Sequence, residues 1–190
     1  MARDAGATVD RILEGALAVL ARSGPRKLSI SDVCQEAAVA RGTLYRYFAS
    51  KDELLDAVAR YVGRGAESRL ALAIERQPDP AQRVEVVFDV ITRFDWLHPG
   101  HRQILEHEPR FALAYIRDVF PHFVDLAAAA LEPAADLIPT VRDGQLTVRD
   151  VAEIALRAGA STVYLPADDA ERLTQAMMAM VGAGSYAARR

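Results

Sequence analysis

The chain has 190 residues and a formal net charge of −3; 51% of its residues are hydrophobic and only 7% aromatic. This suffices for a packed core in one ordinary domain or two small ones, and the abundance of alanine and leucine favours helices over sheets. No stretch approaches the roughly 18 uncharged apolar residues of a membrane span. The N-terminus also lacks a signal-peptide core, so we expect a cytoplasmic protein. The single cysteine, Cys34, excludes an intrachain disulfide and a cysteine-cluster metal site.

Charge is distributed unevenly along the chain. Residues 1–64 carry ten Lys or Arg and eight Asp or Glu, a net charge of +2, whereas residues 65–190 carry thirteen and eighteen, a net charge of −5. A basic excess at the N-terminal end is expected if only that end meets phosphates. Because this excess is small, it argues against a non-specific architectural DNA-binding protein, whose affinity is mainly electrostatic.

The N-terminal third predicts four helices, from the spacing of its apolar residues and from its caps and breakers. Thr8 and Ser50 can cap the first and the fourth, and Ser29 has capping-box spacing to Asp32 at the start of the second. Gly24-Pro25 ends the first helix. The predicted helices cover about 8–24, 29–38, 41–48 and 51–76.

Proline-rich breakers divide the rest of the chain into further helices. Pro121 either ends one helix or kinks a single longer one. No alternating strand pattern and no internal repeat occurs. We therefore predict an all-α chain in which a three-helix N-terminal domain (6–66) is joined by a long helix to a helical C-terminal domain (67–190). Its later helices are expected at about 81–97, 100–107, 110–119, 121–136, 147–164 and 168–182.

Residues 29–48 have the layout of a helix-turn-helix, in which two short helices are joined by a tight turn. In this motif the second helix enters the major groove of DNA and the first braces it against the backbone. Arg41 and Thr43 stand at the start of the second helix, where an arginine can bind guanine bidentately and a threonine methyl can touch thymine. Long donors placed to reach phosphates follow: Tyr45, Tyr47 and Lys51.

Residues 37–54 read Ala-Ala-Val-Ala-Arg-Gly-Thr-Leu-Tyr-Arg-Tyr-Phe-Ala-Ser-Lys-Asp-Glu-Leu. This run resembles the signature of the TetR (tetracycline repressor) family of bacterial transcriptional regulators, with its Gly-Thr-Leu-Tyr and Tyr-Phe-x-x-Lys elements at the same spacing. The resemblance covers roughly residues 8–64 and implies a sequence-specific DNA-binding regulator. Gly42 would allow a close approach of the DNA backbone. The DNA-contacting positions implied by the resemblance are Ser29, Arg41, Gly42, Thr43, Tyr45, Tyr47 and Lys51.

Two residues depart from this signature. Ala38 replaces the glycine that usually closes the second helix, where a positive φ is costly for a residue with a Cβ. Ala40 replaces the serine that usually caps the reading helix, a loss of about 1 kcal/mol. Either the turn is altered, or the packing of Val39 and Leu44 compensates.

Each residue of the motif has an ordinary explanation when taken alone. Tyr45, Tyr47 and Phe48 could be core aromatics of a helical bundle. Arg41, Thr43 and Lys51 could be plain surface residues. Only their joint spacing points to DNA. A helical adaptor protein would leave this constellation unexplained.

Large apolar side chains gather between residues 88 and 123. Members of the family usually hold a small effector between their middle helices, and an apolar pocket with few polar groups is the usual form of such a site. Plain core packing is the alternative for each of these residues. A site here would favour a hydrophobic or aromatic effector. The candidate ligand-binding residues are Phe88, Ile91, Phe94, Trp96, Leu105, Phe111, Tyr115, Phe120 and Phe123.

The last two predicted helices each carry an apolar stripe. The resemblance implies a homodimer formed through these helices, and a two-fold dimer matches a palindromic operator. Packing within the chain must account for part of the same face. The candidate interface residues are Val148, Val151, Ala155, Ala158, Thr162, Leu173, Met177, Met180 and Val181.

The four histidines, His98, His101, His107 and His122, all fall in the aromatic-rich region. His98-x-x-His101 has no matching carboxylate or cysteine pattern, so we expect neither a metal nor another cofactor. An enzyme that uses the His98/His101/His107 region is the alternative function, but the sequence carries no phosphate loop and no nucleophile signature. We therefore expect a regulator, most simply a repressor released from DNA by a small-molecule effector, and no enzyme.

Overall fold

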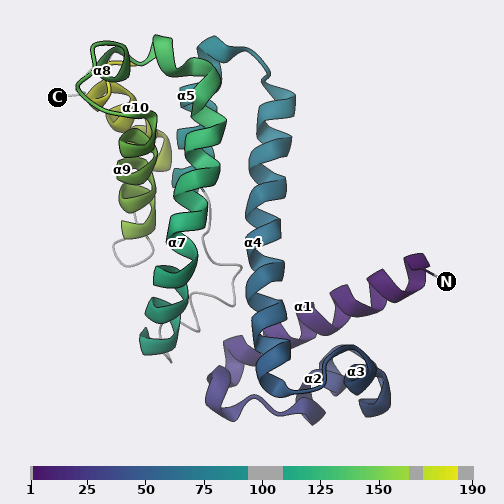
Figure 1. Cartoon of the computed structure of the whole chain (residues 1–190). Helices are drawn as coiled ribbons and strands as arrows, with labels where there is room; N and C mark the ends of the chain where they lie inside the picture. Colours follow the sequence, from purple (N-terminus) through teal and green to yellow (C-terminus); the bar gives the residue numbers. More distant parts are fainter. Residues whose placement is uncertain (1, 94–108, 163–168, 184–190) are drawn as a thin grey trace. The chain divides into compact units, whose positions relative to one another are not determined.

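The computed structural model describes residues 2–93, 109–162 and 169–183 (Figure 1). Every regular element in these ranges is an α-helix or a 3-10 helix, which confirms the predicted all-α fold. Among the described residues, no helix is long and apolar enough to cross a membrane.

Contacts within the chain group the helices into two compact units. Of the described residues, the first unit holds 2–65 and 109–118, and the second holds 66–93, 119–162 and 169–183. The long helices α4 (Lys51–Arg76) and α7 (Pro109–Leu131) each contribute residues to both units. The expected domain boundary, between residues 66 and 67, falls within α4, whereas the contacts group the first half of α7 with the first unit.

The first unit is built on α1 (Ala2–Lys27), α2 (Ile30–Glu36), α3 (Arg41–Tyr47) and the beginning of α4. Helix α1 is interrupted at Gly24, with φ 73° and ψ 168°, where the sequence predicts its end, and residues 25–27 add one further turn. Helices α1 and α2 approach closely, since a Cβ on Gly15 would lie 3.0 Å from the backbone nitrogen of Ala37. The largest fully buried side chains of this core are Ile12, Leu13, Leu17, Val19, Val33, Leu44 and Leu54.

The second unit is organised around α5 (Arg83–Arg93), which packs against both α9 (Val148–Ser161) and α10 (Ala170–Met180). The crossing of α5 and α9 is close, because a Cβ on Gly159 would lie 2.5 Å from Cγ2 of Ile91. The buried hydroxyls of Thr92 and Thr174, 2.6 Å apart, join α5 to α10. Large fully buried side chains of this core include Val87, Phe88, Val124, Leu131 and Ile138.

Pro121 lies inside a continuous helix, so the helices expected at about 110–119 and 121–136 are largely the single helix α7. Proline lacks an N–H and normally interrupts a helix, but Pro121 is exposed while Phe123, Val124 and Ala127 behind it are buried. The packing of this face keeps the helix continuous. The short elements are η1 (Pro80–Gln82), η2 (Glu132–Leu137) and α8 (Pro139–Arg142). The helix expected at 100–107 lies outside the described residues.

Candidate nucleic-acid interface

The turn between α2 and α3 closes as a Schellman motif with alanine in the position that favours glycine. Ala38 has a φ of 51°, the amide of Val39 donates to the carbonyl of Cys34 at 3.0 Å, and the amide of Ala38 donates to that of Gln35 at 3.2 Å. Although alanine replaces the glycine of the signature at position 38, the turn keeps its left-handed conformation, which costs conformational strain.

The start of α3 lacks a side-chain cap. Ala40 is its N-cap, in an extended conformation, and contributes only its carbonyl, which accepts from the amides of Thr43 (2.9 Å) and Leu44 (3.2 Å). Burial holds α3 in place instead, because Leu44 is fully buried and Phe48, directly after the helix, is buried as well. The interpretation of Phe48 as a core aromatic is therefore confirmed.

The opposite face of α3 is turned to solvent. Arg41 and Gly42 are exposed, and Tyr45 is 46% exposed, with the Arg41 guanidinium 6.0 Å from its ring centroid. A Cβ placed on Gly42 would meet nothing within 4 Å. This face therefore leaves room for another molecule to come close to the helix backbone.

A second cation–aromatic pair follows on α3, and sequence reasoning missed one of its partners. The Arg46 guanidinium lies 5.0 Å from the ring centroid of Tyr47, and its Nη2 lies 3.3 Å from the Tyr47 hydroxyl. Thr43 and Tyr47 are half-buried. The signal for Arg46 was its place between two tyrosines of the motif.

Two of the expected DNA-contacting residues also have partners within the chain. The Ser29 hydroxyl accepts from the amide of Asp32 at 3.2 Å and so caps α2. The ammonium of Lys51 donates to the backbone carbonyl of Arg26 at 3.2 Å. At the same helix start, the Ser50 hydroxyl accepts from the amide of Glu53 (3.1 Å), and the Glu53 carboxylate accepts from that of Ala49 (2.7 Å).

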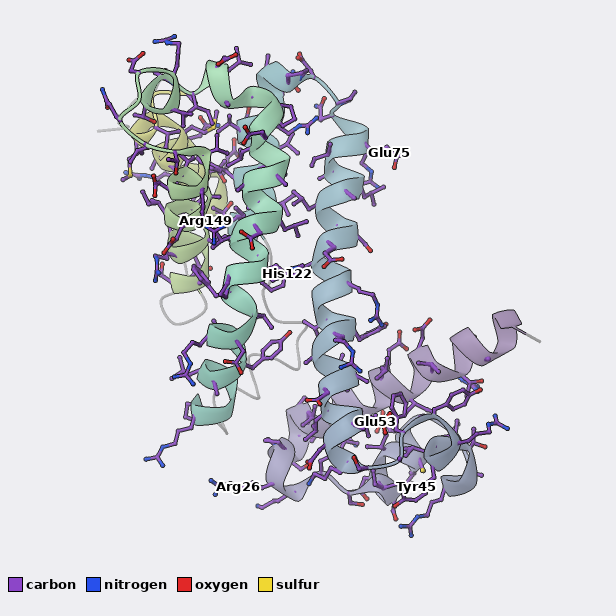
Figure 2. All side chains as sticks on the ribbon, in the orientation of Figure 1. Arg26, Tyr45, Glu53, Glu75, His122 and Arg149 are labelled. Carbon is purple, nitrogen blue, oxygen red and sulfur yellow. The ribbon has the colours of Figure 1, made fainter. Side chains whose placement is uncertain are left out.

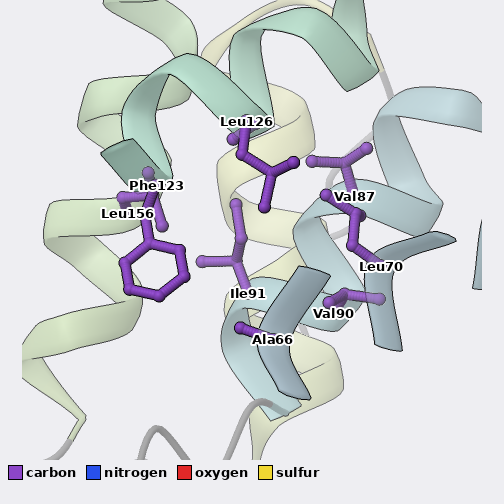
Figure 3. A pocket seen from close by; sticks show the side chains of 9 residues that line it. Ala66, Leu70, Val87, Val90, Ile91, Phe123, Leu126 and Leu156 are labelled. Carbon is purple, nitrogen blue, oxygen red and sulfur yellow. The ribbon is translucent and has the colours of Figure 1, made fainter. Parts of the chain in front are cut away.

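A small apolar cavity lies in the second unit (Figure 3). It holds ≈ 350 Å³ of empty space, part of it open to solvent. Two of the expected ligand-binding residues, Ile91 and Phe123, line it. The other lining residues were not foreseen, because most are small or aliphatic: Ala66, Leu70, Val87, Val90, Leu126, Ala127 and Leu156.

The remaining expected ligand-binding residues lie elsewhere or outside the described part. Phe88 is fully buried in the core, and the Phe120 ring packs under the Arg157 guanidinium, 4.9 Å from its centroid. The Tyr115 hydroxyl donates to the carbonyl of Ala59 at 3.1 Å in the first unit, and burial raises its pKa to about 12. Outside the described residues or side chains lie Phe94, Trp96, Leu105 and Phe111.

Most of the expected interface residues on α9 and α10 are buried within their own unit. Those buried this way are Val148, Val151, Ala155, Met177 and Val181. Ala158, Thr162 and Leu173 are half-buried, and Met180 is 74% exposed. Ile154, which was not foreseen, is 45% exposed on α9.

Of the four histidines, only His122 lies within the described residues. Nε2 of His122 lies 2.6 Å from a carboxylate oxygen of Glu67, and both side chains face solvent in part. His98, His101 and His107 lie outside the described residues. Burial raises the pKa of the Cys34 thiol, and the Arg41 charge partly opposes this shift.

Comparison with known proteins points to one family. Residues 12–58 match the family model described as "Bacterial regulatory proteins, tetR family". The chain is 39% identical over 59 residues to an uncharacterized HTH-type transcriptional regulator, YvdT of Bacillus subtilis, covering 31% of this chain and 30% of that one. It is 29% identical over 116 residues to the HTH-type transcriptional repressor KstR2 of Mycobacterium tuberculosis, 56% of each. The matches thus span about a third to just over half of these relatives.

A solved structure extends the likeness of the fold beyond residues 12–58. The transcriptional regulator FadR from Bacillus subtilis, in complex with stearoyl-CoA, matches with a TM-score of 0.61 and 17% sequence identity. The match covers 93% of this chain and 98% of that one. At this identity the likeness establishes the fold and leaves the ligand of this chain open.

Proposed function

Because the chain belongs to the tetR family of bacterial regulatory proteins, we propose that it is a sequence-specific DNA-binding regulator of transcription. In its simplest form it is a repressor that leaves its operator when a small apolar or aromatic molecule binds. Helix α3 carries the proposal, because its inner side is anchored by the buried Leu44 while Arg41, Gly42 and Tyr45 face solvent. A helix held in this way can enter a major groove.

The residues of this face divide by chemistry. Arg41 is the candidate for a bidentate contact with guanine, and the methyl group of Thr43 for contact with thymine. The hydroxyls of Ser29, Tyr45 and Tyr47 and the ammonium of Lys51 are candidates for phosphate contacts. Lys51 donates one hydrogen bond to Arg26, so two of its three N–H donors are free for a phosphate.

We propose a homodimer on a palindromic operator as the working form. Helix α10 carries partly or fully exposed apolar residues at Leu173, Ala176 and Met180, one helical turn apart, and Ile154 is exposed on α9. Covering such residues with the same face of a second copy removes apolar surface from water. A two-fold dimer would present two α3 helices to an inverted repeat.

The cavity of the second unit supports an apolar effector. Its nine lining residues carry no polar side chain, and ligand pockets are likewise lined mainly by apolar side chains. An apolar molecule that binds more tightly to a conformation with low DNA affinity would shift the protein toward that conformation.

Genomic-DNA affinity capture with the purified protein, followed by sequencing, tests the proposal. We expect a few sites that share a short inverted repeat. Arg41→Ala and Thr43→Ala should each weaken binding to the recovered site by about tenfold or more while leaving the protein folded. Arg142→Ala, which removes an exposed arginine of the second unit, is the matched control and should bind normally. Wild-type affinity in both α3 variants would remove α3 as the reading helix.

A further inference from the structure

Three basic side chains gather where α1 ends and α4 begins. Gly24, with its φ of 73°, breaks α1, so that residues 25–27 form a separate turn carrying Arg26 and Lys27, both exposed. The ammonium of Lys51, from the first residue of α4, donates to the Arg26 carbonyl at 3.2 Å. Residues 25 positions apart in sequence thereby bring a third positive charge to the same turn.

This basic cluster, Arg26, Lys27 and Lys51, is not neutralised from within the described part of the chain. Across residues 2–93, 109–162 and 169–183, no carboxylate pairs with any of the three. The nearby Glu53 is engaged with the Ala49 amide at 2.7 Å. In contrast, Arg22, one turn earlier on α1, is paired with Glu36 at 2.8 Å.

The cluster and the exposed face of α3 lie toward the same end of the first unit. Figure 2 shows Arg26 and Tyr45 both at its lower end. Like charges held together without a counter-ion repel one another, and an anion that binds between them relieves this repulsion. At the same end of the unit as the proposed reading helix, the anion with the right chemistry is the phosphate of the DNA backbone.

We propose that Arg26 and Lys27, together with Lys51, form a phosphate-binding cluster that grips the sugar-phosphate backbone independently of base sequence. The proposal rests on the proposed function and adds two contacts that the sequence motif does not include. Phosphate contacts fix the position of a protein on DNA, whereas contacts with base edges give specificity. The cluster therefore contributes affinity and register, and α3 contributes the choice of sequence.

Salt dependence distinguishes this role from base reading. Fluorescence anisotropy with a short duplex of mixed sequence, over a series of KCl concentrations, measures the slope of log K against log [KCl]. Each of Arg26→Gln and Lys27→Gln should reduce the magnitude of this slope by about 0.9 and the low-salt affinity by roughly fivefold to tenfold. Arg76→Gln, an identical charge change at an exposed arginine of the second unit, should leave both unchanged.

The operator recovered by genomic-DNA affinity capture provides a second test of the cluster. Affinity for it should fall by the same factor as for the mixed duplex, so that the specificity ratio is retained. If both cluster variants keep the wild-type slope while the wild-type protein binds DNA normally, the proposed phosphate-binding role of the cluster is wrong. A loss confined to the operator would assign the residues to base reading and overturn it too. Wild-type protein that binds no duplex at any salt concentration would instead refute the proposed function. Circular dichroism confirms that the variants are folded.

Discussion

The backbone amide of Val39 donates to the carbonyl of Cys34, five residues earlier in the chain and 3.0 Å away. This bond closes α2 and requires the intervening Ala38 to adopt a φ of 51°. The same motif ends α10, where the amide of Ala183 donates to the carbonyl of Met178 at 2.9 Å across Gly182, with a φ of 75°. One turn thus uses glycine where the other, beside the candidate reading helix, holds an alanine under strain.

Ala38→Gly should therefore stabilise the protein. Glycine adopts a positive φ without strain, and the gain is reduced by its greater freedom in the unfolded chain. We expect the free energy of unfolding to rise by about 0.5–1 kcal/mol, measured by urea titration followed by circular dichroism. Gly182→Ala is the reciprocal control and should destabilise, since its Cβ would also lie 3.1 Å from Pro139. A loss of stability in Ala38→Gly would show that the turn is not strained.

Ala40→Ser should also stabilise the protein, by supplying the cap that α3 lacks. Ala40 already has the extended conformation of an N-cap, with φ −72° and ψ 149°, so a serine hydroxyl can accept from an amide of the first turn. The expected gain is about 1 kcal/mol in the free energy of unfolding. Ser50→Ala removes a cap that is present on α4 and should lose about the same amount. The cap on α3 has no effect if thermal unfolding of Ala40→Ser matches that of the wild type.

The sequence was most informative where structure is local. The caps at Ser29 and Ser50, the break at Gly24 and the buried Leu44 all depend on residues a few positions apart, and the structure has them where they were expected. A strained Ala38 was foreseeable because a left-handed turn has a known position in the motif.

Features that depend on packing between distant parts of the chain could not be predicted from the sequence. The cavity is lined by small residues such as Ala66 and Ala127, which sequence reasoning passed over in favour of aromatics. Which small side chains leave a space depends on how four helices pack, and no local pattern encodes this. The contact of Lys51 with Arg26 was missed for the same reason. Continuity of α7 through Pro121 likewise depended on the burial of its inner face.

Gly42→Ala separates folding from DNA binding. Its Cβ would meet nothing within 4 Å and would favour the helix, so stability should hold or rise by up to about 1 kcal/mol. DNA affinity should fall, because the added methyl group occupies the space into which a duplex would come close. Gly63→Ala on α4 is the matched control, with equally open surroundings, and should gain stability without losing DNA affinity. Fluorescence anisotropy with the captured operator measures the DNA affinity of both variants. Equal affinities would mean that DNA does not approach Gly42 closely.

Ala127→Leu tests whether the cavity binds apolar molecules. Ala127 is buried and lines the cavity, so three added carbons reduce the empty space without introducing a polar group. The wild-type protein should enhance the fluorescence of N-phenyl-1-naphthylamine, an apolar probe, and the variant should bind it at least several-fold more weakly. Ala81→Leu, which adds the same group at an exposed position of η1, should bind the probe as the wild type does. Undiminished probe binding by a folded Ala127→Leu protein would locate the apolar site elsewhere, and the effector would then have to be sought at another surface.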